Sequence, residues 1–442
     1  MIFPILKYIK PIWYFNLNTI KNDCWIDYES LKNKELIEFD KNYSDYKVSL
    51  LDAAYQAKLK GYIPNQNSKF IIPTKIVTTE YDNFRFINKF FSKKMSFYAL
   101  FLKIILFDNV IESCMAFFKS IDVKKLNILH KINDNSHFER FKCNLIEKNV
   151  GVSVIIPTLN RYEYLKDVLK DLEKQNHKNF EVIIIDQSDN FDRNFYEKFK
   201  LNKKIIYQTE KALWLARNRA VTESKHDLIL LFDDDSRVDC DWISNHLKCI
   251  EYFNCHISSG ISLSLNDTTI PNNYRIFKIS DQIDTGNVLI KKDVFKETGL
   301  FDRQFEKQRM GDGEFGLRAY KLGFVNISNP YSKRLHLKAG LGGLRDMGSW
   351  DAFRPKSFFS ARPIPSVLYY FRKYYGGKLS VFSLIRNIPQ SVIPYKLKHS
   401  KLKFFGYLIV VLILPIIITQ VLISWRLASI KLNEGDKIKR FE

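Results

Sequence analysis

The sequence predicts an α/β protein whose central domain is a doubly wound, largely parallel sheet. Between about Gly151 and Gly343, short apolar runs typical of buried strands alternate with segments whose apolar residues recur at helical spacing. One of these runs, Leu228–Phe232, leads directly into Asp233-Asp234-Asp235. Because open α/β sheets bind ligands at the carboxyl ends of their strands, the three aspartates lie where a site is expected.

The predicted elements of this domain follow a βαβ order. Four runs rich in β-branched or other apolar residues are expected to be strands: Val152–Pro157, Glu181–Asp186, Lys204–Gln208 and Leu228–Phe232. Three segments with helical periodicity are expected to be helices: Arg161–Gln175, Leu213–Ser224 and Asp241–Phe253. We place the domain at residues 150–345, between an α-rich extension at 1–149 without a chemical motif and a helical region at 346–442.

Two segments outside this domain are apolar enough to concern a membrane. Ser96–Ser120 reads as one amphipathic helix that should not span a bilayer, because charged residues interrupt it. Phe404–Trp425 has 22 residues without a charge, which is long enough to span a membrane. Lysines and arginines flank it on both sides, so they do not fix an orientation. The alternative is a buried or hairpin-like interfacial helix kinked at Pro415.

The composition leaves two readings of the charge. A net charge of +21 invites a nucleic-acid partner, but the lysines are spread along the whole chain and no nucleic-acid-binding signature occurs. Basic residues mixed with 23 Tyr and 35 Phe fit an anionic membrane surface at least as well. We therefore expect a membrane surface and no nucleic acid among the partners. Six irregularly spaced cysteines suggest free thiols.

The aspartate triplet suggests a metal site. Three adjacent carboxylates are costly to hold together unless a cation lies among them. Oxygen ligands of this kind suit Mg²⁺ or Mn²⁺, which typically join carboxylates to a substrate's phosphates. Considered alone, the triplet fits an exposed acidic turn equally well.

Four motifs together resemble family 2 glycosyltransferases. They are Val-Ser-Val-Ile-Ile-Pro-Thr-Leu-Asn-Arg, Ile-Ile-Ile-Asp-Gln-Ser, Ala216-Arg217-Asn218-Arg219-Ala220 and Phe-Asp-Asp-Asp, and they occur in the family's order. The resemblance covers about Val152 to His336. It implies a GT-A fold, a nucleotide-sugar donor and, for most members, inversion at the anomeric carbon.

The resemblance also implies roles for individual residues. The implied donor-binding set comprises Pro157, Thr158, Asn160, Asp186, Arg217, Asp233, Asp234, Gly286 and Asn287. Asp233 and Asp235 match the family's Asp-x-Asp, and with His336 they form the implied set of metal ligands. Asp312, in Met310-Gly-Asp-Gly-Glu-Phe-Gly-Leu-Arg318, occupies the position of the catalytic base, with Gly311 in place of the usual first acid.

These inferences lead to one expected function and one alternative. We expect an inverting, metal-dependent glycosyltransferase of surface polysaccharide or glycolipid assembly, using Mn²⁺ or Mg²⁺. Its donor would be a nucleotide sugar, with a UDP-sugar favoured, and its acceptor a hydroxyl of a saccharide or lipid-linked molecule. Its place would be the cytoplasmic face of the cell membrane, peripheral or single-pass anchored. The alternative is a catalytically silent GT-A subunit that binds or scaffolds within a glycan-assembly complex.

Overall fold

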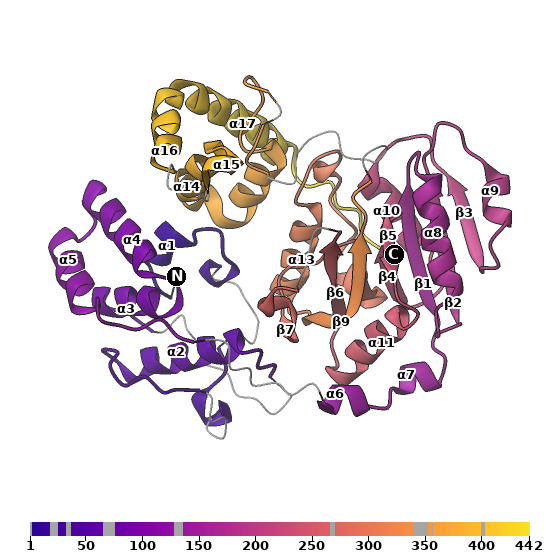
Figure 1. Cartoon of the computed structure of the whole chain (residues 1–442), viewed down its shortest axis with the longest axis horizontal. Coiled ribbons are helices and arrows are strands. Elements are labelled where there is room, and N and C mark those ends of the chain that lie inside the picture. Colours follow the sequence, from indigo (N-terminus) through magenta and orange to yellow (C-terminus); the bar gives the residue numbers. More distant parts are fainter. Residues whose placement is uncertain are drawn as a thin grey trace. The chain divides into compact units, whose positions relative to one another are not determined.

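The chain forms two compact units, seen in a computed structural model that describes residues 2–17, 25–31, 37–64, 76–127, 136–265, 270–339, 352–355, 357–398 and 403–442. Unit 1 comprises Met1–Ile132 and Gly348–Glu434, and unit 2 comprises Asn133–Met347 and Gly435–Glu442 (Figure 1). The amino-terminal extension and most of the carboxyl-terminal region therefore share one unit. The last eight residues belong to the other unit, which contains the central domain.

Unit 2 is built on a mixed sheet with the strand order β3-β2-β1-β4-β8-β6-β9-β5, in which β7 also pairs with β9. Its strands are β1 (Val152–Thr158), β2 (Phe180–Asp186), β3 (Lys203–Tyr207), β4 (Leu228–Phe232), β5 (Ser236–Val238), β6 (Ile257–Ser264), β7 (Lys278–Ile279), β8 (Asn287–Lys291) and β9 (Asn326–His336). Strands β3, β2, β1 and β4 are parallel, and β8 joins β4 in antiparallel register. Strands β1, β2 and β4 are buried along their whole length, as expected for a sheet covered on both faces.

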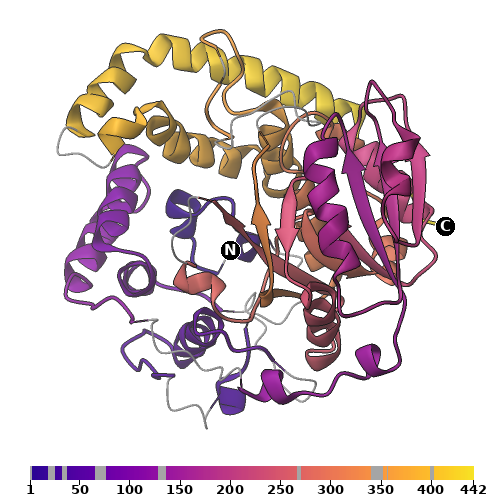
Figure 2. The same ribbon diagram turned by 45° about the vertical axis from the view of Figure 1, so that its right-hand side comes forward.

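Helices cover both faces of this sheet (Figures 1 and 2). On one face lie α8 (Tyr162–Glu173) and α11 (Trp242–Tyr252), and on the other α10 (Leu213–Thr222), α12 (Lys292–Thr298) and α13 (Gly311–Leu322). Three short helices complete the unit: α6 (Ser136–Arg140), α7 (Asn144–Glu147) and α9 (Arg193–Glu197). The fold class predicted from the sequence, an α/β doubly wound sheet with helical segments on either side in the chain, is confirmed.

Unit 1 is helical in its described part. Its amino-terminal segment contributes α1 (Leu6–Ile9), α2 (Tyr46–Leu59), α3 (Glu80–Phe90), α4 (Lys93–Ile105) and α5 (Val110–Lys119). Its carboxyl-terminal segment contributes α14 (Pro365–Val392), α15 (Tyr395–Lys398), α16 (Lys403–Leu412) and α17 (Leu414–Glu434). Helix α1 contacts both α4 and α14, and Tyr8 stacks edge-on against Phe382, which joins the two segments.

Two segments that the sequence presented as single helices are broken. Ser96–Ser120 divides into α4 and α5, because Asp108 between them is held by the ammonium of Lys7 at 2.7 Å and the hydroxyl of Tyr8 at 2.5 Å. Phe404–Trp425 divides into α16 and α17 immediately before Pro415, whose ring cannot follow in a continuous helix. By length and composition α17 is the one described helix that could cross a membrane.

A buried ion-pair network stabilises unit 1. The ammonium of Lys89 lies 2.6 Å from Asp52 and 3.2 Å from Asp40, and the guanidinium of Arg85 forms a further pair with Asp40. The Asp52 side chain is fully buried, and Tyr43 also donates a hydrogen bond to it. Burial raises the pKa of Asp52 even though Lys89 acts to lower it. Asp52 therefore depends on Lys89 to compensate its charge.

Replacing Lys89 with Met should destabilise unit 1 by about 3–5 kcal/mol, because it leaves a buried carboxylate without its cation. Urea unfolding of the full-length protein measures the change. Lys47→Met, at an exposed position on α2, is the matched control and should change the free energy of unfolding by less than about 0.5 kcal/mol. Equal effects of the two substitutions would show that the buried ion pairs of Lys89 contribute no more to the free energy of unfolding than an exposed lysine does.

Candidate active site

The aspartate triplet lies where the sequence placed it, at the carboxyl end of β4. Asp233, Asp234 and Asp235 form the turn between β4 and β5, and β5 pairs antiparallel with β9, so that Ser236 stands opposite His336. This pairing brings the Nε2 atom of His336 to 3.3 Å from Oδ1 of Asp235. The short strand β5 therefore explains why two residues a hundred positions apart in sequence meet.

Two arginines hold Asp233. Nη2 of Arg217, on α10, donates to Oδ1 at 2.7 Å, and Nη1 of Arg334, on β9, donates to Oδ2 at 2.8 Å. Both guanidinium groups are almost completely buried. Nη2 of Arg334 also contacts both carboxylate oxygens of Asp284, at 3.0 and 2.9 Å. Asp233 is thus fixed from two elements of the fold at once.

A third arginine serves the other two aspartates. Nη1 of Arg161 lies 3.1 Å from Asp234 and 3.3 Å from Asp235. Burial raises the pKa of Asp234 to about 7, against the lowering effect of Arg161. Burial acts the same way on Asp235, but the hydrogen bond and charge of His336, together with Arg161, outweigh it, so the pKa of Asp235 lies below its ordinary value.

Asp234 has more contacts than a variable middle position suggests. The hydroxyl of Thr158, the last residue of β1, donates to Asp234 at 2.8 Å, and both residues are buried. This bond joins the carboxyl ends of β1 and β4. Pro157, predicted beside Thr158 in the donor site, lies buried in β1 opposite Ile185.

The ends of β1 and β2 form a second polar group of residues. Asp186, fully buried, accepts hydrogen bonds from the hydroxyls of Tyr162 at 2.6 Å and Tyr196 at 2.7 Å. Burial, followed by the hydrogen bond to Asp186, raises the pKa of Tyr162 to about 12. Asn160 adopts a positive φ of 54° after β1 and exchanges hydrogen bonds with Asp189, so it links the same two strand ends.

Gly286 and Asn287, predicted together in the donor site, have different surroundings. A Cβ on Gly286 would lie 1.9 Å from Nη1 of Arg334 and 2.1 Å from Oδ2 of Asp233, so only glycine fits against this ion pair. The Asn287 side chain instead points into the core. It accepts from Trp242 at 2.8 Å and donates to the carbonyls of Ile261 and Ser332, where the pairing of β6 with β9 shifts register.

Asp312 lies at the start of α13, partly exposed, where its carboxylate accepts a hydrogen bond from the Gly313 amide at 2.8 Å. A Cβ on the preceding residue, Gly311, would lie 2.3 Å from the indole of Trp214. The Arg217 guanidinium lies 5.2 Å from the centroid of that indole. A chain of contacts therefore connects the start of α13 to Asp233, and it leaves no room for an acid at position 311.

The residues present fit a divalent cation. Asp233, Asp235 and His336 each offer a ligand atom, and these atoms lie within 4.8 Å of one another. Carboxylate oxygens and an imidazole nitrogen form a donor set that suits Mn²⁺ and is compatible with Mg²⁺ through the oxygens. Within the described residues this is the one group of three such side chains.

The sequence did not reveal the residues that organise the site. Arg334 stands in β9 outside any motif. Arg161 follows Asn160 at the end of the first motif, but the sequence did not indicate a role for it. Tyr162 gave no signal either, although its hydroxyl binds Asp186. The number of charges offers the best available signal, since two buried carboxylates and a third that is partly buried need cations nearby. The Gly-Leu-Gly-Gly sequence at 340–343 is typical of a mobile loop that could close over donor and acceptor, but it lies outside the described residues.

Comparison with known proteins identifies the segment that carries these groups. Residues 153–306 match the family model of glycosyl transferase family 2. This segment is therefore similar to glycosyltransferases of family 2. The match extends from β1 to the residues just before α13, so it includes the aspartate triplet and Arg217.

Proteins with similar sequences occur in different organisms. The chain is 25% identical over 247 residues to a chondroitin synthase of Pasteurella multocida, covering 43% of this chain and 26% of that protein. It is 29% identical over 124 residues to TuaG of Bacillus subtilis, named for teichuronic acid biosynthesis, covering 27% and 49%. The matched part thus spans about a quarter to a half of these relatives.

Among solved structures, the chain resembles the mannosyltransferase PcManGT of Pyrobaculum calidifontis, in complex with GDP-Man and Mn²⁺. The two are 16% identical with a TM-score of 0.43, and the likeness covers 64% of this chain and 87% of the other.

Replacing Arg334 with Leu should lower the free energy of unfolding by about 3 kcal/mol, because Asp233 and Asp284 both lose a buried cation. Arg334→Lys should lower it less, since it keeps the charge but cannot serve Asp233 and Asp284 with two separate nitrogens. Lys204→Leu, which breaks an exposed pair with Glu223, is the control and should cost less than about 1 kcal/mol. Chemical denaturation measures all three. If Arg334→Leu lowers the free energy of unfolding no more than the control does, Arg334 does not organise the site.

Proposed function

We propose that this chain is an inverting, metal-dependent glycosyltransferase. It transfers a sugar from a nucleotide-diphosphate donor to a hydroxyl of a saccharide or lipid-linked acceptor during the assembly of a surface polysaccharide or glycolipid. The observation that carries the proposal is the convergence of Asp233, Asp235 and His336 at the edge of the sheet, in a domain that matches family 2.

Asp233, Asp235 and His336 would hold Mn²⁺ or Mg²⁺. A divalent cation at this position offsets the negative charge that develops on the leaving diphosphate. Arg161 and Arg217 add fixed positive charge at the same edge of the sheet, where they favour an anionic donor. Thr158, Asn160 and Asp186, at the neighbouring strand ends, are the residues we assign to the nucleoside.

Asp312 is the residue that we assign as the general base. An acceptor hydroxyl must lose its proton as its oxygen attacks the anomeric carbon, so a carboxylate within hydrogen-bond reach is required. Asp312 is partly exposed at the first turn of α13, and it accepts the hydrogen bond from the Gly313 amide through Oδ1. The proton passes to Asp312, the bond to the diphosphate breaks, and a single displacement inverts the anomeric configuration.

The names of the relatives support a polysaccharide acceptor. Two of them are named for the synthesis of chondroitin and for the biosynthesis of teichuronic acid. We favour a UDP-sugar as donor on the family resemblance. The exposed apolar residues of α16 and α17 favour a position at the cytoplasmic face of the membrane, where nucleotide sugars meet lipid-linked acceptors.

The second candidate function is a catalytically silent subunit that binds or scaffolds. One observation favours this second function. Both carboxylate oxygens of Asp233 already accept hydrogen bonds from arginines within the protein. A silent subunit would bind a nucleotide without turning it over, so binding and turnover need to be measured separately.

Donor hydrolysis should require a divalent cation. We expect the full-length protein to release nucleoside diphosphate from at least one of UDP-glucose, UDP-N-acetylglucosamine, UDP-galactose and GDP-mannose with Mn²⁺ or Mg²⁺, and to stop on addition of EDTA. Asp235→Asn should weaken Mn²⁺ binding, measured by calorimetry, about 10–100-fold, because it removes a charged ligand. Turnover that persists in EDTA would contradict the metal assignment.

Replacing Asp312 with Asn should lower donor turnover by about 10²–10⁴-fold while donor binding stays near the wild-type value, because only the base is lost. Asp293→Asn, an exposed acid on α12 in the same unit, is the matched control and should keep full activity. Metal-dependent binding of UDP without turnover of any donor would instead establish the silent subunit.

A further inference from the structure

The α4–α5 hairpin of unit 1 exposes an unusual number of large apolar side chains. Phe107, at its tip, is 89% exposed, and Ile111 is 77% exposed. The exposed set within the hairpin comprises Phe97, Phe101, Ile104, Ile105, Leu106, Phe107, Ile111, Met115 and Phe118. Contiguous apolar surface of this extent marks an interaction site in a soluble domain.

The hairpin presents this face in a fixed position. Small and apolar residues on its inner side, including Ala99, Leu102 and Ala116, are buried against unit 1. The buried ammonium of Lys103 pairs with Glu80 at 2.9 Å, and Asp108 at the turn is held by Lys7. The outward side chains are therefore exposed on an anchored element of the fold.

Exposed lysines stand where the hairpin begins and where it ends in the sequence. Lys93 and Lys94 stand exposed where α4 begins, and Lys119 and Lys124 stand exposed where α5 ends. Glu112 is the only exposed acid between Lys93 and Lys119, a stretch that is described without a gap. Apolar side chains bordered by lysines are complementary to a bilayer with anionic headgroups.

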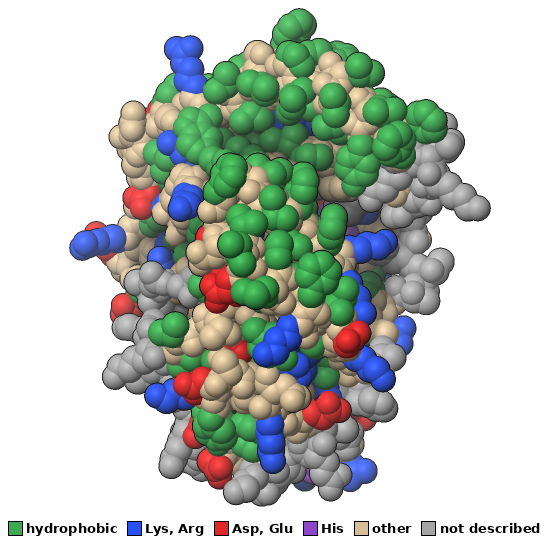
Figure 3. All heavy atoms as spheres, turned by 90° about the vertical axis from the view of Figure 1, so that its left-hand side faces the viewer, with side chains coloured by type: hydrophobic (Ala, Val, Ile, Leu, Met, Phe, Trp, Pro, Cys, Tyr) green, Lys and Arg blue, Asp and Glu red, His purple; other side chains and the backbone are tan. Residues whose placement is uncertain are grey.

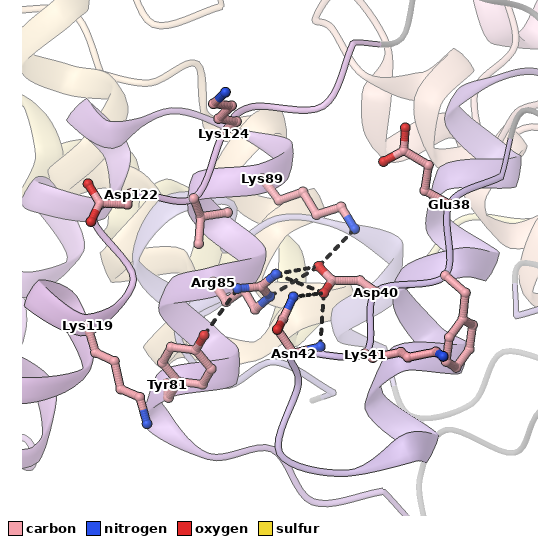
Figure 4. A pocket seen from close by; sticks show the side chains of 12 residues that line it. Glu38, Asp40, Lys41, Asn42, Tyr81, Arg85, Lys89, Lys119, Asp122 and Lys124 are labelled. Atoms are coloured by element: carbon pink, nitrogen blue, oxygen red, sulfur yellow. Dashed lines mark hydrogen bonds and ion pairs between the residues drawn. The ribbon is translucent and has the colours of Figure 1, made fainter.

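A pocket at the end of α5 adds to this positive charge. It has a volume of about 730 Å³, and Lys119 and Lys124 lie on its wall with Lys41 (Figure 4). Arg85 and Lys89 line it as well, although Asp40 neutralises part of their charge. The lining residues carry five positive and three negative charges, which favours an anionic group such as a lipid phosphate.

The same unit carries a second apolar surface. Residues of α16 and α17, including Val411, Leu412 and Leu422, are more than half exposed. Apolar side chains cover the upper part of one face of the molecule, over both α16–α17 and α4–α5 (Figure 3). The two surfaces of unit 1 can therefore meet one flat partner.

We propose that the α4–α5 hairpin docks onto an anionic lipid bilayer. Its tip and the outward side of α5 enter the interfacial region, while Lys119 and Lys124 contact headgroup phosphates. This goes beyond the proposed function, which places membrane contact in the carboxyl-terminal helices. It also stands apart from catalysis, because none of these residues belongs to unit 2.

Hydrogen–deuterium exchange of the full-length protein tests the contact directly. Vesicles containing phosphatidylglycerol should slow amide exchange over residues 104–112, and they should leave the exposed β6 end around Leu265 unchanged. The combined substitutions Phe107→Asn, Ile111→Gln and Phe118→Gln should weaken vesicle binding in co-sedimentation by about tenfold or more. Asn tolerates the positive φ of 53° at position 107, and Leu265→Gln, 65% exposed in unit 2, is the matched control.

A second pair of substitutions tests the charge. Lys119→Gln with Lys124→Gln should reduce binding to phosphatidylglycerol vesicles by about fivefold per lysine, with little change for pure phosphatidylcholine vesicles. Unchanged exchange over residues 104–112 while α17 becomes protected would overturn the proposal. So would a lipid-free protein that is dimeric and becomes monomeric in the apolar variant, because a second copy would then cover the face. Donor hydrolysis in detergent should not change in any of these variants.

Discussion

The ion pairs of Asp233 with Arg217 and Arg334 are the interaction on which the site depends. One arginine comes from a helix on one face of the sheet and the other from strand β9, so Asp233 joins elements that are distant in sequence. With Arg161 included, three carboxylates of one turn meet three guanidinium groups. This balance allows acidic groups to be concentrated at a buried strand end, which would otherwise cost several kcal/mol per charge.

Other features of the site follow from this balance. Gly286 has no side chain because the pair of Arg334 with Asp233 occupies the space where a Cβ would lie. Asp234 is buried and accepts a hydrogen bond from Thr158, so it joins the ends of β1 and β4. The register shift between β6 and β9 determines where Arg334 and His336 emerge from β9, and Asn287 holds that irregularity with two hydrogen bonds.

Periodicity in the sequence was sufficient to predict the first four strands of the central domain and three of its helices. Strand β4 was predicted with its observed bounds, and β1 and β2 within one residue at each end, because buried parallel strands are continuous apolar runs. Strand β3, which is not buried, was also predicted within one residue at each end. The positions of Asp233 and Asp235 beside His336 were implied by motifs. Arg334 could not be found in this way, since its role depends on the register of two distant strands. The break after α4 was also invisible, because it is Lys7, about a hundred residues earlier, that binds Asp108.

The last eight residues of the sequence belong to unit 2, although they follow the helices of unit 1 in the chain. The Leu300 amide bonds the carbonyl of Lys439, and Asp302 accepts a hydrogen bond from the amide of Lys437. Gly299 leaves room for Ile438 beside it. A fragment cut at residue 345 would therefore leave these backbone groups beside α12 and α13 without partners. Unit 2 is therefore built from two separate stretches of the chain, with Gly348–Glu434 of unit 1 between them in sequence.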